Sequence, residues 1–336
     1  MNLFRKSLLL AISLLVLAGC TERPSTNNEN APSATVDGKN NLLRIKRYEK
    51  ALFSLKQQDF ASELKAIAPE YKVFLGKDYA SPEALNQLSA FVGDAQNQEI
   101  YRECMTRFPE LSAMESEFSD AFSRLSKAIP GFRTPLVYTY VSGFDFAYPI
   151  KYADSALIIA LDMYLGSDYK GYPALGIPNY ISQRLTPDHI LPDCLKEMAY
   201  PYLKGNQAPT LLDAMTEEGK ILWFAGLMLP ETKENLIIGY STPQLKWCED
   251  NEYNIWSFLI ENELLYSKDA RSMSMFMSDG PFTASFSEES PARTGAWVGW
   301  QIMKAYAEKS GKGVAEIMAM TDSQEILEKS GYKPRK

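Results

Sequence analysis

The sequence predicts an α+β fold that is mostly α-helical, with a small β-sheet between two helical parts. Apolar residues recur at the 3.6-residue helical period before residue 130. Two short runs rich in β-branched residues lie between residues 136 and 161, and helical patterns resume from Pro187. The chain has 336 residues, 46% of them hydrophobic, which is enough to bury a full core.

The N-terminal part is predicted to be helical. Ser81-Pro82-Glu83 has the form of a helix start, with a capping serine and proline at the first helical position. A second helix should end at Pro130-Gly131. The two apolar stripes are Phe60, Leu64, Ile67, Tyr71 and Phe74, and then Leu111, Met114, Phe118, Phe122, Leu125 and Ile129.

The middle of the chain is predicted to supply two or three strands, including residues 136–141 and 156–161. Residues 169–178, rich in Tyr, Gly and Pro, are expected to form a loop. The later helical segments are residues 187–203, 210–227, 242–265, 291–309, 313–320 and 324–329. Gly295, Trp297, Gly299 and Trp300 indicate close helix packing with aromatic anchors.

Charge and composition exclude several kinds of protein. A net charge of -7 gives no electrostatic reason to bind nucleic acid or anionic lipid. The one histidine, His189, excludes a zinc site built from several histidines. Four cysteines are too few and too dispersed for a disulfide scaffold or a C-x-x-C metal site. We therefore predict no metal and no cofactor.

Residues 1–19 are predicted to be a lipoprotein signal peptide. Two basic residues precede the apolar residues 7–17, a stretch too short to span a bilayer. The stretch ends in Leu17-Ala18-Gly19-Cys20, which matches the bacterial lipoprotein cleavage box. Cleavage there makes Cys20 the acylated first residue, and acyl chains contribute about 0.8 kcal/mol per buried CH₂ to anchoring. The alternative is a plain signal peptide with Cys20 present by chance.

Residues 20–41 are predicted to be the lipidated cysteine and a flexible tether. This segment consists mainly of Ser, Thr, Asn and Pro and cannot bury enough surface to offset its ordering entropy. Residues 42–336 contain no further linker or repeat, so we expect a single globular domain. It would face the periplasm from a membrane anchor, with the outer membrane favoured because Thr21 rather than Asp follows the lipidated cysteine.

Two helical stretches resemble the core of zinc peptidases of the gluzincin type. Those enzymes place His-Glu-x-x-His on one helix and a third ligand, a glutamate, on the next, and the Glu between the histidines polarises the metal-bound water. Lys196 and Tyr200 stand at the two imidazole positions, Glu197 at the general base and Glu218 at the third ligand. We name these four residues the relic cleft, since the resemblance implies a metallopeptidase core without its metal site.

Other interpretations of these residues remain open. One alternative is that the two stretches are ordinary amphipathic helices with no relation to a peptidase. Another is that Glu197 and Glu218 form a general acid/base pair that needs no metal. Alternatively, Lys196 can neutralise these carboxylates by a salt bridge. Arg293, in Ser290-Pro291-Ala292-Arg293, can bind an anion beside a helix start or pair with a carboxylate. His189 lies seven residues before Lys196 and can share its helix face.

Several stretches of the chain occur in the order typical of one family. They are Arg47-Tyr48-Glu49-Lys50-Ala51-Leu52-Phe53, Leu161-Asp162-Met163-Tyr164-Leu165-Gly166, Ile190-Leu191-Pro192-Asp193, Leu211-Leu212-Asp213, Gly239-Tyr240-Ser241, Gln244-Leu245-Lys246-Trp247-Cys248, Glu263-Leu264-Leu265-Tyr266-Ser267, Gly280-Pro281-Phe282-Thr283, and Ser290-Pro291-Ala292-Arg293-Thr294-Gly295-Ala296-Trp297-Val298-Gly299-Trp300. With the lipoprotein box, the chain resembles the gliding-motility lipoprotein family GldB of Bacteroidota.

The resemblance implies an envelope lipoprotein needed for gliding, with partner proteins in the motility and secretion machinery. It supplies no catalytic residue, and only Cys20 has a role at the level of a residue. We therefore expect a non-enzymatic lipoprotein that acts by binding machinery components. The alternatives are a divergent hydrolase that uses Glu197 and Glu218, and a pseudo-enzyme that binds peptides in the relic cleft.

Overall fold

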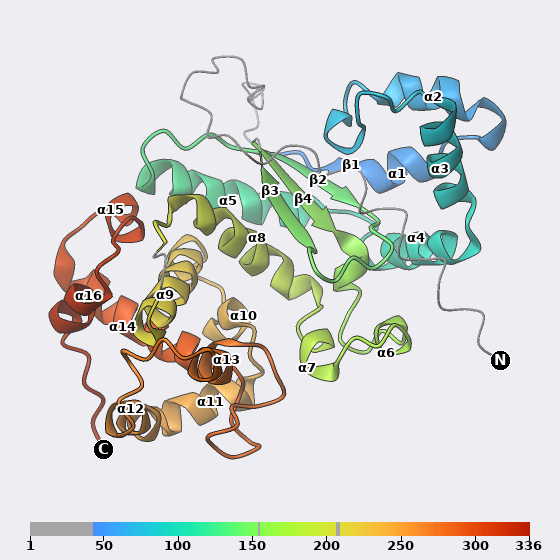
Figure 1. The fold of residues 1–336 in the computed structure, drawn as a ribbon. Coiled ribbons are helices and arrows are strands. Elements are labelled where there is room, and N and C mark those ends of the chain that lie inside the picture. The colour runs from blue at the N-terminus through green and yellow to red at the C-terminus, as the bar shows by residue number, and fades with distance from the viewer. Residues whose placement is uncertain (1–42, 154, 206–208) are drawn as a thin grey trace.

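A four-stranded mixed sheet lies between the two groups of helices in the computed structural model, which describes residues 43–153, 155–205 and 209–336 (Figure 1). The strands are β1 (Lys46–Arg47), β2 (Leu136–Tyr140), β3 (Ile150–Ala153) and β4 (Ala156–Ala160), in the spatial order β1-β2-β4-β3. β1 and β4 run parallel to β2, with Leu136 opposite Ala156, and β3 runs antiparallel to β4. The signal peptide, Cys20 and the tether through residue 41 lie outside the described residues.

The helices before the sheet confirm most of the N-terminal prediction. They are α1 (Tyr48–Phe53), α2 (Phe60–Ile67), α3 (Pro82–Gly93), α4 (Ala95–Arg107) and α5 (Ser112–Ala128). The Ser81 hydroxyl accepts the Ala84 N–H at 3.2 Å, as expected of a helix cap. The continuation of the first stripe as a helix to Phe74 is wrong, because α2 ends at Ile67. Tyr71 and Phe74 instead pack around Tyr48, whose ring stacks on Phe74 at 4.2 Å.

The helices after the sheet form the larger group in Figure 1. They are α6 (Gly171–Ala174), α7 (Asn179–Ser182), α8 (Ile190–Ala199), α9 (Leu211–Met228), α10 (Glu234–Ile238), α11 (Thr242–Asp250), α12 (Glu252–Glu261), α13 (Ala270–Met277), α14 (Thr294–Ser310), α15 (Val314–Met318) and α16 (Ser323–Ser330). The structure thus confirms a mostly helical α+β fold. Some details differ. The helical segment 242–265 is interrupted at Asn251, and the expected loop 169–178 contains the single turn α6. The short helices α7, α10 and α13 were not predicted.

The closest helix contact joins α9 and α14 through two glycines. A Cβ on Gly299 would lie 1.8 Å from the Met215 carbonyl oxygen, and one on Gly219 would lie 2.3 Å from the Gly299 carbonyl oxygen. Only glycine fits at such a distance, so this contact confirms the predicted close packing of α14. It also fixes the start of α14 beside the middle of α9.

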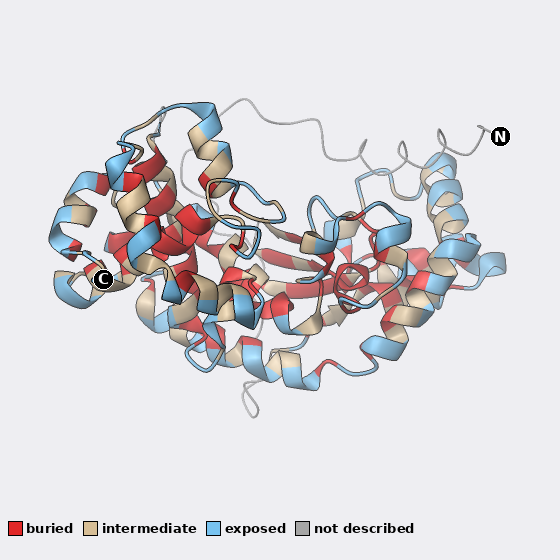
Figure 2. Cartoon of the chain, turned by 90° about the horizontal axis from the view of Figure 1, so that it is seen from below, coloured by how far each residue is buried: buried red, intermediate tan, exposed pale blue. Residues whose placement is uncertain are grey.

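Buried side chains run continuously from the sheet into the C-terminal helices (Figure 2). A smaller core cluster lies between α1, α2, α3 and one face of β2. Cys104, Cys194 and Cys248 are free thiols buried in the core. No helix within residues 43–153, 155–205 and 209–336 is long and apolar enough to cross a bilayer.

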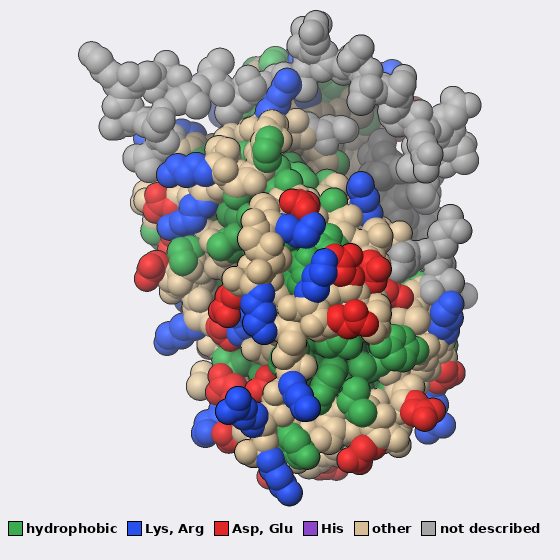
Figure 3. All heavy atoms as spheres, turned by 90° about the vertical axis from the view of Figure 1, so that its left-hand side faces the viewer, with side chains coloured by type: hydrophobic (Ala, Val, Ile, Leu, Met, Phe, Trp, Pro, Cys, Tyr) green, Lys and Arg blue, Asp and Glu red, His purple; other side chains and the backbone are tan. Residues whose placement is uncertain are grey.

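The face formed by the C-terminal helices carries both signs of charge. Basic and acidic side chains are interspersed around small groups of apolar ones (Figure 3). This face therefore has no large field of a single sign.

Candidate functional site

The helix α8 and the turn that follows it hold three residues of the relic cleft. Lys196 and Glu197 lie in the last turn of α8, and Tyr200 begins the short 3-10 helix Tyr200–Tyr202. Because α8 packs against α9, Tyr200 comes close to Glu218 of that helix. Burial, followed by the charges of Glu218 and Glu197, raises the pKa of Tyr200 to about 12. The structure therefore places Tyr200 where the charges of Glu197 and Glu218 both act on it.

Lys196 forms its salt bridge in the described part of the chain with Asp193, although its charge also lowers the pKa of Glu197 against the effect of burial. Its ammonium group lies 2.7 Å from Asp193 Oδ1, one helical turn earlier on α8, and the Tyr164 hydroxyl donates to Asp193 Oδ2 at 2.9 Å. Burial alone would raise the pKa of Asp193, but Lys196 and this hydroxyl together hold it below the usual range. The i,i+3 partner is nearer than any carboxylate on α9.

Glu218 is paired with Arg293. The Arg293 guanidinium donates through Nη2 to Glu218 Oε1, and both side chains are largely buried, with 15% and 22% of their side-chain surface exposed. Of the two interpretations of Arg293, pairing with a carboxylate is therefore confirmed. The pKa of Arg293 is raised despite its burial, because Glu218 and Asp279 lie beside it. The Gly219–Gly299 contact explains the pairing, since it brings the start of α14 next to Glu218.

The backbone of Arg293 is held in a strained conformation. Its φ of 59° and ψ of 33° lie in the left-handed region, which a non-glycine residue rarely adopts. The preceding backbone is fixed by two hydroxyls: Tyr240 donates to the Ala292 carbonyl at 2.7 Å, and buried Thr283 donates to the Pro291 carbonyl at 2.8 Å. Surrounding structure of this kind sustains local strain, and such strain clusters at functional sites.

A polar cavity of about 280 Å³ opens beside Arg293. Its walls come from residues 180–189, 239–244 and 279–293, with Ser167 at its edge. Arg184 donates two parallel hydrogen bonds to Asp279, at 2.9 Å from Nη1 to Oδ1 and 2.6 Å from Nη2 to Oδ2. Arg293 Nε lies 4.0 Å from the same Asp279 Oδ1, so one carboxylate links the two arginines.

His189 contributes to this cavity rather than to a catalytic helix face. It closes the 3-10 turn Pro187–His189 before α8, and its Nδ1 lies 2.8 Å from the Thr186 hydroxyl oxygen. Burial, with a smaller effect of Lys196, lowers the pKa of His189. Its imidazole is therefore neutral at pH 7 and adds no charge to the cavity.

Sequence reasoning missed Arg184 and Asp279. They are separated by 95 positions, and neither belongs to a periodic pattern or a known motif. The only local signal is the turn at Gly280-Pro281 directly after Asp279, which marks a bend but not its partner.

The relic cleft does not fit a zinc ion. A zinc site of this kind needs two neutral imidazoles and a free carboxylate, whereas Lys196 offers a cation, Tyr200 a phenol with a raised pKa, and Glu218 a carboxylate already bound by Arg293. Within the described ranges, no three His, Cys, Asp or Glu side chains come together as ligands. The donor set is suited to polar binding, so no metal-dependent step follows from it.

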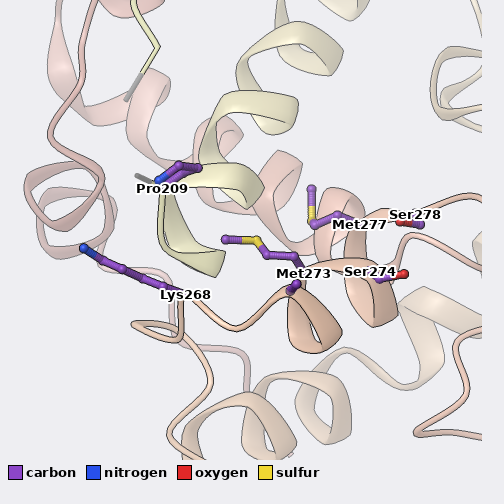
Figure 4. A pocket seen from close by; sticks show the side chains of 7 residues that line it. Pro209, Lys268, Met273, Ser274, Met277 and Ser278 are labelled. Atoms are coloured by element: carbon purple, nitrogen blue, oxygen red, sulfur yellow. The ribbon is translucent and has the colours of Figure 1, made fainter. Parts of the chain in front are cut away.

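A second cavity, of about 560 Å³, lies beside α13 and is mainly apolar (Figure 4). Met273 and Met277 extend into it from α13, and Lys268 and Pro209 lie at its border. Methionine side chains adapt to varied apolar surfaces, but this lining presents a single charged group and no partner for acid–base chemistry. We therefore take the cavity at Arg293 as the candidate site.

The comparison with known families decides the wider assignment. The family model of the gliding motility protein GldB matches residues 27–334, nearly the whole chain. The chain belongs to the GldB family. Neither the curated proteins nor the solved structures contain a significant match to it.

Membership of the GldB family confirms the resemblance drawn from the ordered sequence stretches. It associates the chain with gliding motility and with a lipoprotein family. Arg293, Glu218 and the cavity all lie within the matched residues, so the candidate site is part of the GldB domain.

Proposed function

We propose that this GldB-family chain is a lipid-anchored envelope protein that acts by binding components of the gliding machinery and not by catalysis. The observation that carries the proposal is the ion pair between Arg293 and Glu218. It engages the carboxylate that a zinc peptidase would use as its third ligand, in a cleft where Lys196 already places a second cation. The cavity beside the pair remains open to a ligand.

The anchor is proposed to be Cys20, with the mature domain in the periplasm on the outer membrane. Radioactive palmitate should label the wild-type protein and should not label Cys20→Ala. Equal labelling of the two proteins would refute the anchor without affecting the proposed binding role.

The binding role is tested by affinity purification of the tagged full-length protein from membranes of a gliding host. We expect motility or secretion components to co-purify and deletion of the chain to stop colony spreading. Normal spreading of the deletion strain would contradict the motility role. Purification without any such component, from cells in which spreading depends on the protein, would contradict the binding role.

A second candidate function, a divergent hydrolase, is favoured by one observation. Burial and the neighbouring charge of Asp193 raise the pKa of Glu197, as in a general acid. A peptide-library assay with metal analysis separates the two candidates. Cleavage that is lost in Glu197→Gln would favour the hydrolase, and the proposed binding role predicts no cleavage.

A further inference from the structure

We infer that the cavity beside Arg293 binds the terminal carboxylate of a polypeptide, an inference that rests on the proposed binding role and names the chemistry of its ligand. The cavity combines a guanidinium that has unused donors, a charge balance that disfavours a dianion, and amide groups that suit a peptide.

Arg293 has donors to spare. A guanidinium carries five N–H donors in a planar fork. Within the described residues Arg293 gives one hydrogen bond, to Glu218, and its Nε is too far from Asp279 for another. Among the described residues, two fully buried side-chain polar atoms have no hydrogen-bond partner, Tyr48 OH and Trp297 Nε1. No nitrogen of Arg293 is among them. The remaining donors of Arg293 are therefore not completely buried, and Arg293 lines the cavity.

The charges around the cavity favour a monoanion over a dianion. Each of the two lining arginines already faces a carboxylate, Arg184 with Asp279 and Arg293 with Glu218, so these four charges sum to zero. A monocarboxylate adds one uncompensated charge where a dianion adds two, and its planar group matches the guanidinium fork. A dianion such as phosphate meets repulsion from Asp279, which is 42% exposed at its side chain.

The rest of the lining suits a peptide backbone. Gln244 accepts the Ser241 N–H with its amide oxygen at 2.9 Å, so its amide NH₂ can donate to a ligand carbonyl. Gln183 offers a second amide in the lining, and Gly239 adds a stretch of wall without a side chain. A chain end in the cavity can therefore place its carboxylate on Arg293 and its last peptide groups against these amides.

The direct test is calorimetric titration of the purified full-length protein in detergent with two matched probes, N-acetyl-trialanine as the free acid and as the C-terminal amide. We expect the acid to bind at least about tenfold more tightly, since one charge-assisted interaction distinguishes the probes. Acetate should bind more weakly than the peptide acid, and inorganic phosphate more weakly still. Equal binding of acid and amide, undetectable binding of the acid, or tighter binding of phosphate would overturn the inference.

Variants assign the binding to this cavity. Arg293→Lys keeps the charge opposite Glu218 but loses the fork, and should weaken binding of the acid about tenfold. Ser167→Trp adds bulk to the lining from an exposed position that belongs to neither ion pair, so it keeps the test valid if Arg293→Lys fails to fold. Exposed Arg102→Gln is the matched control and should bind as wild type. Unchanged affinity in Ser167→Trp would overturn the inference. Failure here would leave the motility role intact, because colony spreading and co-purification are measured separately.

Discussion

Arg293 and Glu218 illustrate how single residues determine what the site can do. The two opposite charges form an ion pair between largely buried side chains. Removing one partner would leave the other as an unpaired buried charge, which destabilises the folded state. The sequence predicted both residues as candidates and left two roles open for Arg293. It could not choose between them, because the choice depends on the distance between two helices 75 positions apart.

We expect this pair to be strongly coupled. Glu218→Gln and Arg293→Met should each lower the free energy of unfolding by about 1–3 kcal/mol, because each leaves a buried charge unpaired. In the double variant, the loss of unfolding free energy should be at least about 1 kcal/mol smaller than the sum of the two single losses. Chemical denaturation of the four proteins measures this difference. Asp250→Asn, which breaks the exposed Lys246–Asp250 pair, is the control and should leave the free energy of unfolding almost unchanged. Strictly additive costs would show that the two side chains do not interact.

His189 should make stability depend on pH. Burial, opposed by the charge of Asp193, holds its folded-state pKa below that of the unfolded chain. At pH values between the folded-state and unfolded-state pKa of His189, the unfolded chain binds more protons than the folded one. The free energy of unfolding therefore falls as the pH falls from about 7 toward the lower pKa. Wild type should lose more stability than His189→Gln between about pH 7.5 and about pH 5.5. Denaturant midpoints at both pH values measure this difference, and equal losses would be the contrary result.

Helices and strands were predicted best where one clear sequence signal, such as a long apolar stripe or a capping motif, marks them. The helix α5 and the start of α3 follow from a long apolar stripe and from a capping serine with proline. The strand β1 has two residues, too few to show an alternating pattern, and α10 and α13 are short helices that the sequence analysis did not identify. Tyr71 and Phe74 continue a helical period by coincidence, since their aromatic contacts hold them in a turn.

The crossing of α9 and α14 provides a prediction at this scale. Gly299→Ala should lower the free energy of unfolding by about 3 kcal/mol or more, because its Cβ would collide with the Met215 carbonyl. Gly226→Ala on α9 is the matched control: its Cβ would meet Trp300 at an ordinary 3.5 Å. The control should gain up to about 1 kcal/mol from its higher helix propensity. Similar thermal unfolding of the two variants would contradict the close helix contact.

The whole molecule assembles the site from segments that the sequence keeps apart. The helices that carry Lys196, Glu197 and Glu218 were predictable, because each has its own apolar pattern. The Arg184–Asp279 pair and the cavity were not, because they depend on how three distant loops meet around the start of α14. Membership of the GldB family gives this assembly a biological setting in gliding motility.

Colony spreading of a gliding host that carries Glu197→Gln in place of wild type tests the central claim most directly. This change removes the carboxylate of the relic cleft whose pKa is raised and leaves the Arg293–Glu218 pair and the cavity in place. A protein that works by binding predicts spreading equal to wild type. Loss of spreading, with the variant present at normal abundance in the membrane, would contradict a non-enzymatic role.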